Sequence, residues 1–376
     1  MGDEGATCAG AGKGRTLAAL TRKDVEARMA ARTPPEKGIR AFYSSVYGGI
    51  VDEYALMAVP LDDHQVHRGH AIFDTCHIIG GSTWGLDAHL DRFMRSSRIA
   101  RIDVARLPIF PGGRSAADLA VAGEGAEAAV RARVREILVE LFAHSGVRDG
   151  MSRYWMSAGT GDFHVTPYDC VPSLYAMVVP MNWDRLMDED GRAAVRVATT
   201  DVPMKPPPYC VVKSNNYLQN AHVQMSARDK GADLGVFTYT NGAGETCVAE
   251  GPTCNCVFAD RGGKLVVPSF QYALRGVTLL RLIDLVERAE GLEALTGVEI
   301  REVRLAEVLE MAGGAGALAE CFIVSSGNMG TTVSSWDGTP IAARESPCAK
   351  EVGRILRADM RPGGGSEFFE KIEYFD

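Results

Sequence analysis

Long hydrophobic runs are missing from this sequence of 376 residues. It has no stretch of about 18 consecutive apolar residues, roughly the length that a transmembrane helix needs. The chain begins Met1-Gly2-Asp3-Glu4, which lacks the basic and then apolar layout of a secretory signal peptide. We therefore expect neither a membrane-spanning helix nor a membrane partner.

The first part of the chain also lacks a clear hydrophobic pattern. Residues 1–37 are rich in Ala, Gly, Arg, Lys and Thr, a composition that a plastid leader shares, although acidic residues occur at positions 3 and 4. The simplest interpretation is a flexible N-terminal tail. We expect a cytoplasmic protein and leave a plastid location open.

An excess of positive charge is absent, since the formal net charge is −8. Proteins that bind nucleic acid usually carry a basic surface that contacts phosphates. The sequence therefore argues against nucleic acid as the main partner, and an acidic balance is compatible with an enzyme that acts on small molecules.

Cysteine and histidine patterns that would hold a metal are incomplete. The nine cysteines are scattered and odd in number, which favours reduced thiols. Cys254 and Cys256 have no second Cys or His pair at zinc-site spacing. His64, His67 and His70 lie close together but precede a strand without helical spacing, so we predict no metal site.

What is present is a set of strand and helix patterns over two domains, an α+β chain. We predict a small α/β domain at residues 38–181, a connection at 182–192, a larger domain at 193–362 and a loose tail at 363–376. Helices are expected at 86–102, 126–144, 215–230, 278–290 and 349–360. Strands are expected at 73–79, 173–180, 196–200, 255–259, 265–267 and 321–325.

Lys213 is the most unusual charged residue of the second domain. It follows the apolar pair Val211-Val212, which we interpret as the end of a strand that turns into a helix. Burial would lower the pKa of such an amine, as Schiff-base chemistry requires, but a solvated lysine at a strand end would look the same.

Several other segments could bind an anion or a cation. Gly276-Val277-Thr278 opens the helix expected at 278–290, where free backbone N–H groups suit a phosphate, and Ser326 follows a strand in a Ser-Ser-Gly turn. Glu250 precedes a Gly-Pro turn, where a buried carboxylate would need a cationic partner. Arg92 is one of four arginines on the helix at 86–102, of which only one has to point inward.

Taken together, these segments resemble the class IV aminotransferases, a family of fold type IV pyridoxal-phosphate enzymes. The resemblance covers roughly residues 40–362. It is carried by HRGHAIFDT (67–75), LDAHLDR (86–92), VKSNNYLQN (212–220), AEGPTCNCVF (249–258), RGVT (275–278) and VSSGNMGTTVSSWDG (324–338). It implies a larger domain with a β-barrel-like core, pyridoxal 5′-phosphate as cofactor, amino and oxo acids as substrates, and a homodimer.

The resemblance also implies residue roles. Lys213 would carry the cofactor as a Schiff base and then move the proton between the substrate Cα and the cofactor C4′. Glu250 would pair with the pyridine nitrogen. Arg92, Val277, Thr278 and Ser326 would hold the phosphate, and Tyr217 would lie near the phenolic oxygen of the ring.

Within the family, Asn216 completes a K-S-x-N pattern typical of the branch that contains D-amino acid transaminases and aminodeoxychorismate lyases. A departure concerns the substrate carboxylate, because the stretch at 157–161 lacks the arginine that many relatives place there. Arg153, His164 or Lys205 could substitute. A second departure from the family pattern is Gly330-Thr331-Thr332, which is less apolar than the same stretch in many relatives and leaves the shape of the substrate open.

Three activities fit these residues. The first is amino transfer from a D-amino acid such as D-alanine to 2-oxoglutarate. The second is aminodeoxychorismate lysis, in which Thr75 could assist protonation, and the third is a branched-chain aminotransferase-like activity. A cofactor-binding protein without turnover is a further alternative that Lys213 and Glu250 together argue against.

Overall fold

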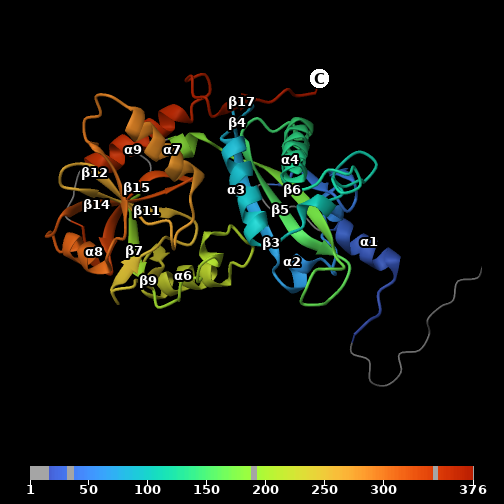
Figure 1. Cartoon of the computed structure of the whole chain (residues 1–376), viewed down its shortest axis with the longest axis horizontal. Coiled ribbons are helices and arrows are strands. Elements are labelled where there is room, and N and C mark those ends of the chain that lie inside the picture. Colours follow the sequence, from blue (N-terminus) through green and yellow to red (C-terminus); the bar gives the residue numbers. More distant parts are fainter. Residues whose placement is uncertain (1–16, 32–37, 188–192, 342–345, 376) are drawn as a thin grey trace, which may run out of the picture.

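The computed structural model describes residues 17–31, 38–187, 193–341 and 346–375. The chain combines helices with strands that form two large sheets, which confirms the α+β class (Figure 1). Within the described residues, no helix is long and apolar enough to cross a membrane.

The first sheet has seven strands, and every neighbouring pair in it is antiparallel. Its order is β17 (Phe369–Lys371), β4 (Ser82–Trp84), β3 (Ala71–Ile79), β5 (Gly150–Thr160), β6 (Val171–Pro180), β1 (Ala41–Ser44) and β2 (Gly49–Val51). Helices α3 (Leu86–Ile99) and α4 (Glu124–Ser145) pack against it through apolar side chains such as Leu90, Phe93 and Leu138. Gly146, with φ of 65°, ends α4 in the left-handed conformation that favours glycine.

The second sheet is mixed. Its path runs through β13 (Gly297–Arg301), β12 (Lys264–Pro268), β11 (Asn255–Asp260), β14 (Leu318–Ser325), β15 (Asn328–Trp336), β7 (Val195–Thr199) and β8 (Leu234–Val236). β16 (Thr339–Pro340) pairs with β15, and β9 (Thr238–Thr240) pairs with β10 (Thr246–Val248) as a separate hairpin.

Both faces of this second sheet are covered, which explains why its strands read as continuous apolar runs. Val257 of β11 packs with α7 (Val277–Arg288) and α9 (Pro347–Asp359). Phe258, which points to the opposite face, packs with α8 (Leu305–Ala312).

The two sheets share part of one hydrophobic core. Ile79 and Trp84 of the first sheet pack in the same cluster as α7 and α9. The Trp84 indole also donates a hydrogen bond of 3.1 Å to the buried Asp359 carboxylate of α9. Helix α3 lies at the boundary between the two halves (Figure 1).

The prediction of a loose C-terminal tail at 363–376 is wrong. The chain crosses back to the first half, where β17 forms the edge of the first sheet beside β4 (Figure 1). Ile372 is only 2 % exposed, and the Tyr374 hydroxyl donates a hydrogen bond to the Val147 carbonyl. The three glycines at 363–365 suggested a free end, but they form the turn that leads into this strand.

The connection at 182–192 is also more ordered than a polar, irregular loop. Trp183 is buried and donates a hydrogen bond of 2.7 Å to the Ile78 carbonyl, and a short helix, α5 (Asp184–Met187), follows it. Residues 188–192 lie outside the described residues.

The predicted N-terminal tail contains a helix, α1 (Arg22–Ala30), which has no buried residue. Its N-terminus is a capping box between Thr21 and Asp24, a local device that forms without a hydrophobic core. Residues 1–16 and 32–37 lie outside the described residues.

The predicted helix at 215–230 starts later, as α6 (Leu218–Asp229), because Asn215 and Asn216 form hydrogen bonds to Ala71 and Gly69 instead. Lys213 also does not follow a strand, as we had expected. It follows a short 3₁₀ helix, η3 (Tyr209–Val211).

Candidate active site

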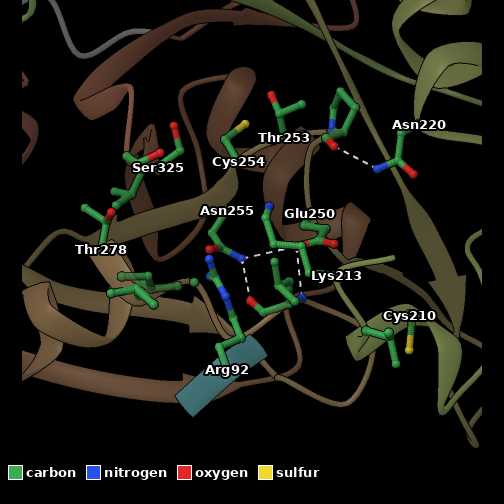
Figure 2. A pocket seen from close by; sticks show the side chains of 18 of the residues that line it. Arg92, Cys210, Lys213, Asn220, Glu250, Thr253, Cys254, Asn255, Thr278 and Ser325 are labelled. Atoms are coloured by element: carbon green, nitrogen blue, oxygen red, sulfur yellow. Dashed lines mark hydrogen bonds between the residues drawn. The ribbon is translucent and has the colours of Figure 1, made fainter. Parts of the chain in front are cut away.

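A small cavity lies where the two halves of the molecule meet. Figure 2 shows Lys213 and Glu250 at its centre, with Thr278 and Ser325 on one side and Asn220 on the other. All the residues predicted to hold the cofactor line this one cavity: Arg92, Lys213, Tyr217, Glu250, Val277, Thr278 and Ser326. Their elements are far apart in the chain, so only the fold brings them together.

The lysine segment is held along the edge of β3. The Phe73 amide donates a hydrogen bond of 2.8 Å to the Lys213 carbonyl, and the Asn215 amide donates to the Ala71 carbonyl. The Asn216 amide group of the K-S-x-N pattern donates to the carbonyl of Gly69, whose φ of 65° favours glycine. A Cβ at Gly69 would lie 2.5 Å from Asn216 Oδ1, so this turn requires glycine for space as well. The lysine is therefore positioned by both halves of the molecule.

The Lys213 amine lies in a poorly solvated position. Its Nζ is 4.7 Å from the centre of the Phe73 ring. Burial lowers the pKa of Lys213 to about 8, and the positive charge of Arg92 acts in the same direction. A substantial fraction of this amine is therefore neutral near physiological pH, as a nucleophile must be.

Glu250 contributes a carboxyl group to the same cavity. Its Oε2 accepts hydrogen bonds from the Leu274 amide at 3.0 Å and from the Asn255 side chain at 3.3 Å (Figure 2). Burial raises the pKa of Glu250 to about 7, while the Leu274 amide and the charge of Lys213 oppose this rise. A cationic group bound beside it would favour the charged form.

The N-terminus of α7 forms another wall. Its N-cap is Gly276, so no side chain satisfies the first backbone N–H groups, and Val277 and Thr278 open the helix toward the cavity. A Cβ at Gly276 would lie 2.2 Å from Asn255 Oδ1, so a larger residue would displace the asparagine that also contacts Glu250. This wall has the geometry and the partial positive charge that bind phosphate.

Arg92 is the arginine of α3 that points inward. Its guanidinium makes a two-point contact with Asp74 of β3, at 2.9 Å from Nε and 2.6 Å from Nη2. Burial alone would raise the pKa of Asp74, but Arg92 and His89 hold it far below its usual range. His89 Nδ1 lies 2.9 Å from the same carboxylate. The pair fixes Arg92 at the cavity and keeps it charged.

Ser326 and Tyr217 complete the predicted set. Ser326 lies in the turn between β14 and β15, beside Ser325, whose hydroxyl accepts hydrogen bonds from the Gly327 amide and the Asn328 side chain. Tyr217 packs edge to face on Phe73, with ring centres 5.2 Å apart. Burial raises the pKa of Tyr217 to about 12, so its hydroxyl remains protonated.

Of the four residues predicted to contact substrate, Lys205 lines the cavity, whereas Thr75, Arg153 and His164 do not. Thr75 and Arg153 are paired across β3 and β5, and neither lines the cavity. The Arg153 guanidinium nevertheless lies 5.7 Å from the Phe73 ring, and its buried Nε has no hydrogen-bond partner within the described part of the chain. His164 is exposed on the loop between β5 and β6 and does not line the cavity.

Three residues that support the site were not predicted from the sequence: Asp74, His89 and Asn255. Asp74 and Asn255 both lie in the recognised segments, each as a polar residue in an apolar strand, and that pattern could have identified them. His89 lies three residues before Arg92 on the same helix face, which the helical period predicts.

The histidine run forms a packed cluster in which the His64 ring lies 5.1 Å from His67 and 5.2 Å from His70. His64 and His67 belong to the single-turn helix α2 (His64–His67). Among the described residues, no three His, Cys, Asp or Glu side chains are arranged to hold a metal ion. The eight cysteines in the described residues are free thiols.

Comparison with known proteins identifies the family. The model of the amino-transferase class IV family matches residues 71–336, which include every wall of the cavity. The chain belongs to the class IV aminotransferases. It is therefore a pyridoxal-phosphate-dependent transferase.

Relatives of this class IV aminotransferase include the chloroplastic D-amino-acid transaminase of Arabidopsis thaliana, which is 38% identical over 327 residues, 86% of this chain and 77% of the relative. A bifunctional aminodeoxychorismate lyase and D-amino acid transaminase of Mycobacterium tuberculosis is 28% identical over 304 residues, 75% of this chain and 88% of the relative.

Solved structures agree on the fold. The branched-chain aminotransferase of Thermoproteus uzoniensis with norvaline has a TM-score of 0.67 and 18% identity, and covers 89% of this chain and 100% of its own. The enzyme of Thermobaculum terrenum in its PLP form has a TM-score of 0.69 and 16% identity, and covers 90% of this chain and 100% of its own. The cavity of the class IV aminotransferase described here offers what that cofactor requires: an amine, a carboxyl group and an anion-binding helix end.

Proposed function

We propose that this chain is a D-amino acid transaminase that transfers the amino group of a D-alanine-type donor to 2-oxoglutarate. The observation that carries the proposal is the meeting of Lys213, Glu250 and the start of α7 in one cavity. The 38% identity to a relative named D-amino-acid transaminase supports the choice of substrate.

Each residue has a task that its surroundings support. Lys213 would hold the cofactor through its amine, and after release the same amine would take the proton from the substrate Cα. Glu250 would contact the pyridine nitrogen, and the bound cofactor would supply an electron sink for the Cα carbanion. Arg92, Val277, Thr278 and Ser326 would hold the phosphate, with Tyr217 beside the ring oxygen.

The substrate carboxylate needs a cationic partner as well. Arg153 is suited to this role because its guanidinium lies against Phe73, the ring that also contacts the Lys213 amine. Thr75 and His164 have weaker support, since Thr75 donates its backbone amide to Asp74 and His164 is exposed. We also propose a homodimer, and a location in the cytoplasm or, by likeness to the chloroplastic relative, in a plastid.

Aminodeoxychorismate lysis is the second candidate, since the mycobacterial relative is named for both activities. Lys213 would again remove the Cα proton, but pyruvate would then leave. The lyase and the transaminase need the same cofactor residues, so the products have to be measured.

The first experiment follows amino transfer from D-alanine to 2-oxoglutarate, with L-leucine and aminodeoxychorismate as alternative substrates. We expect pyruvate and glutamate from D-alanine, and Lys213→Ala should lower the rate by at least about a hundredfold, because the proton-transfer group is lost. Exposed Lys264→Ala is the control. Release of 4-aminobenzoate without amino transfer would instead identify a lyase.

A second readout does not depend on turnover. Borohydride reduction of the loaded enzyme should attach the cofactor to the peptide that contains Lys213. Attachment at any other lysine would show that the assignment of Lys213 is wrong.

A further inference from the structure

Lys205 is a second amine of the site. The sequence offered it as a partner for the substrate carboxylate, and the roles proposed above do not use it. It is 9% exposed and lines the cavity together with Lys213 and Glu250. Three prolines at 206–208 follow it and restrict the backbone that carries it. The only hydrogen bond that its Nζ makes to the described residues goes to the Asn216 carbonyl, and at 3.5 Å it is long.

Lys205 makes no direct ion pair with the described residues, although Glu250 of the same cavity acts on it from farther away and opposes the lowering of its pKa by burial. Among the described residues, no carboxylate oxygen lies within ion-pair distance of Lys205 Nζ. Lysine is almost never buried without a partner, because desolvation of an unpaired ammonium is costly. An ammonium also has three donors, so a bound carboxylate could be accepted in addition to the Asn216 carbonyl.

Three cations surround one pair of aromatic rings. Lys213 Nζ and the Arg153 guanidinium lie 4.7 and 5.7 Å from the Phe73 ring centre. Lys205 Nζ lies 5.4 Å from the ring centre of Tyr217, which packs on Phe73. One of these cations would bond the cofactor, so two remain for anionic groups of a substrate: Arg153 near Phe73 and Lys205 near Tyr217.

The position of Lys205 suggests which group it takes. The carboxylate next to the reacting carbon must stay close to Lys213, and Arg153 contacts the same ring as Lys213. Lys205 lies in the wall shared by this cavity and a larger neighbouring one, which Val212, Pro206 and Tyr209 also line. A substrate chain that extends away from Lys213 toward this wall would reach Lys205 with its far end.

We propose that Lys205 determines specificity for dicarboxylic substrates by binding the carboxylate remote from the reacting carbon, while Arg153 binds the nearer one. This inference rests on the proposed function, and it names the substrate class, four- or five-carbon dicarboxylic oxo and amino acids. Lys205 acts as a positioning residue for the substrate and takes no part in proton transfer.

The test compares Lys205→Met with Lys205→Arg, and exposed Lys230→Met is the matched control. With D-alanine as donor, we expect Lys205→Met to lower kcat/KM for 2-oxoglutarate relative to 2-oxobutyrate by about tenfold, the usual effect of one lost charged hydrogen bond, mainly through KM. Lys205→Arg should restore much of this preference, and Lys230→Met should not change it.

Direct binding separates this inference from the proposed function. Glutarate, an unreactive dicarboxylate, is titrated into the cofactor-loaded enzyme by calorimetry, with propionate as the monocarboxylate. Glutarate should bind about tenfold more weakly to Lys205→Met, whereas propionate should bind equally well. The wild-type enzyme could transfer no amino group and still bind glutarate more tightly than Lys205→Met does. In that case the proposed function fails and the role of Lys205 stands.

Two results would overturn the inference. One is glutarate binding that is equal in wild type and Lys205→Met. The other is a changed pH dependence of the visible absorbance without a change in glutarate binding, which would mean that Lys205 acts on Glu250. Lys205→Gln serves the same comparison if the methionine variant does not fold.

Discussion

The pKa values of Glu250 and Lys213 are both shifted toward neutral pH, one upward and the other downward. Burial is the largest effect in both cases: it lowers the pKa of Lys213 to about 8 and raises that of Glu250 to about 7. Desolvation disfavours charge of either sign, so one dry cavity shifts an amine downward and a carboxyl group upward. Asp74 is the opposite case, since Arg92 and His89 keep it ionised despite its burial.

The pKa of Lys213 predicts the pH dependence of cofactor uptake by the apoenzyme. Only the neutral amine attacks an aldehyde, so the uptake rate should rise with pH and level off above about pH 8, instead of rising toward the usual lysine value of 10.5. The negative charge of Glu250 raises the pKa of Lys213, so Glu250→Gln should move the inflection to lower pH. Stopped-flow absorbance measures both rates, and a wild-type inflection near pH 10 would show that the amine is solvated.

At the scale of elements, the site depends on where segments end. Gly276 is the N-cap of α7, and Lys213 follows η3 and lies along β3. Ser326 lies in the turn after β14. The C-terminal segment contributes in another way, because β17 closes the edge of the first sheet and Ile372 packs into its core.

Removal of the Ile372 side chain tests whether this segment belongs to the fold. Ile372→Ala should lower the free energy of unfolding by about 2–5 kcal/mol, since it leaves a cavity in a packed core. Phe375→Ala is the control, because that side chain is 67% exposed and its removal should change stability by less than about 0.5 kcal/mol. Urea denaturation measures both, and equal midpoints would show that the C-terminal strand does not pack in solution.

At the scale of the whole molecule, the two sheets are joined by a shared core, and the cavity lies at their junction. One loop of the first half remains apolar at its surface: Phe163, Val165 and Tyr168 are 59%, 78% and 73% exposed. Adjacent exposed large apolar side chains mark interaction surfaces. This loop also contributes to the large cavity beside Lys205.

We therefore predict that this loop forms part of the interface of the proposed homodimer. Light scattering should give twice the chain mass for the wild-type protein, and Val165→Asp should weaken dimerisation by at least about tenfold, because it places a charge in an apolar contact. Leu309→Asp, on the exposed face of α8, should leave the mass unchanged. A monomeric wild type would contradict the proposal.

The sequence by itself determined the elements and the identity of the chemical groups. Helices α3, α4, α7 and α9 follow from apolar side chains at helical spacing, a local property that one segment shows alone. The ordered motifs around Lys213, Glu250 and Thr278 pointed to the cofactor, because they combine an amine, a carboxyl group and the start of a helix, the groups suited to an aldehyde, a pyridine nitrogen and a phosphate.

Only the tertiary structure decided which groups share a cavity and how they ionise. The contact of Asp74 with Arg92, the lack of a direct ion pair at Lys205 within the described residues and the return of β17 to the first sheet depend on segments far apart in the chain. Burial is a property of the packed whole, and no local pattern fixes it, so the pKa values of Lys213 and Glu250 could not be read from their neighbours in the sequence.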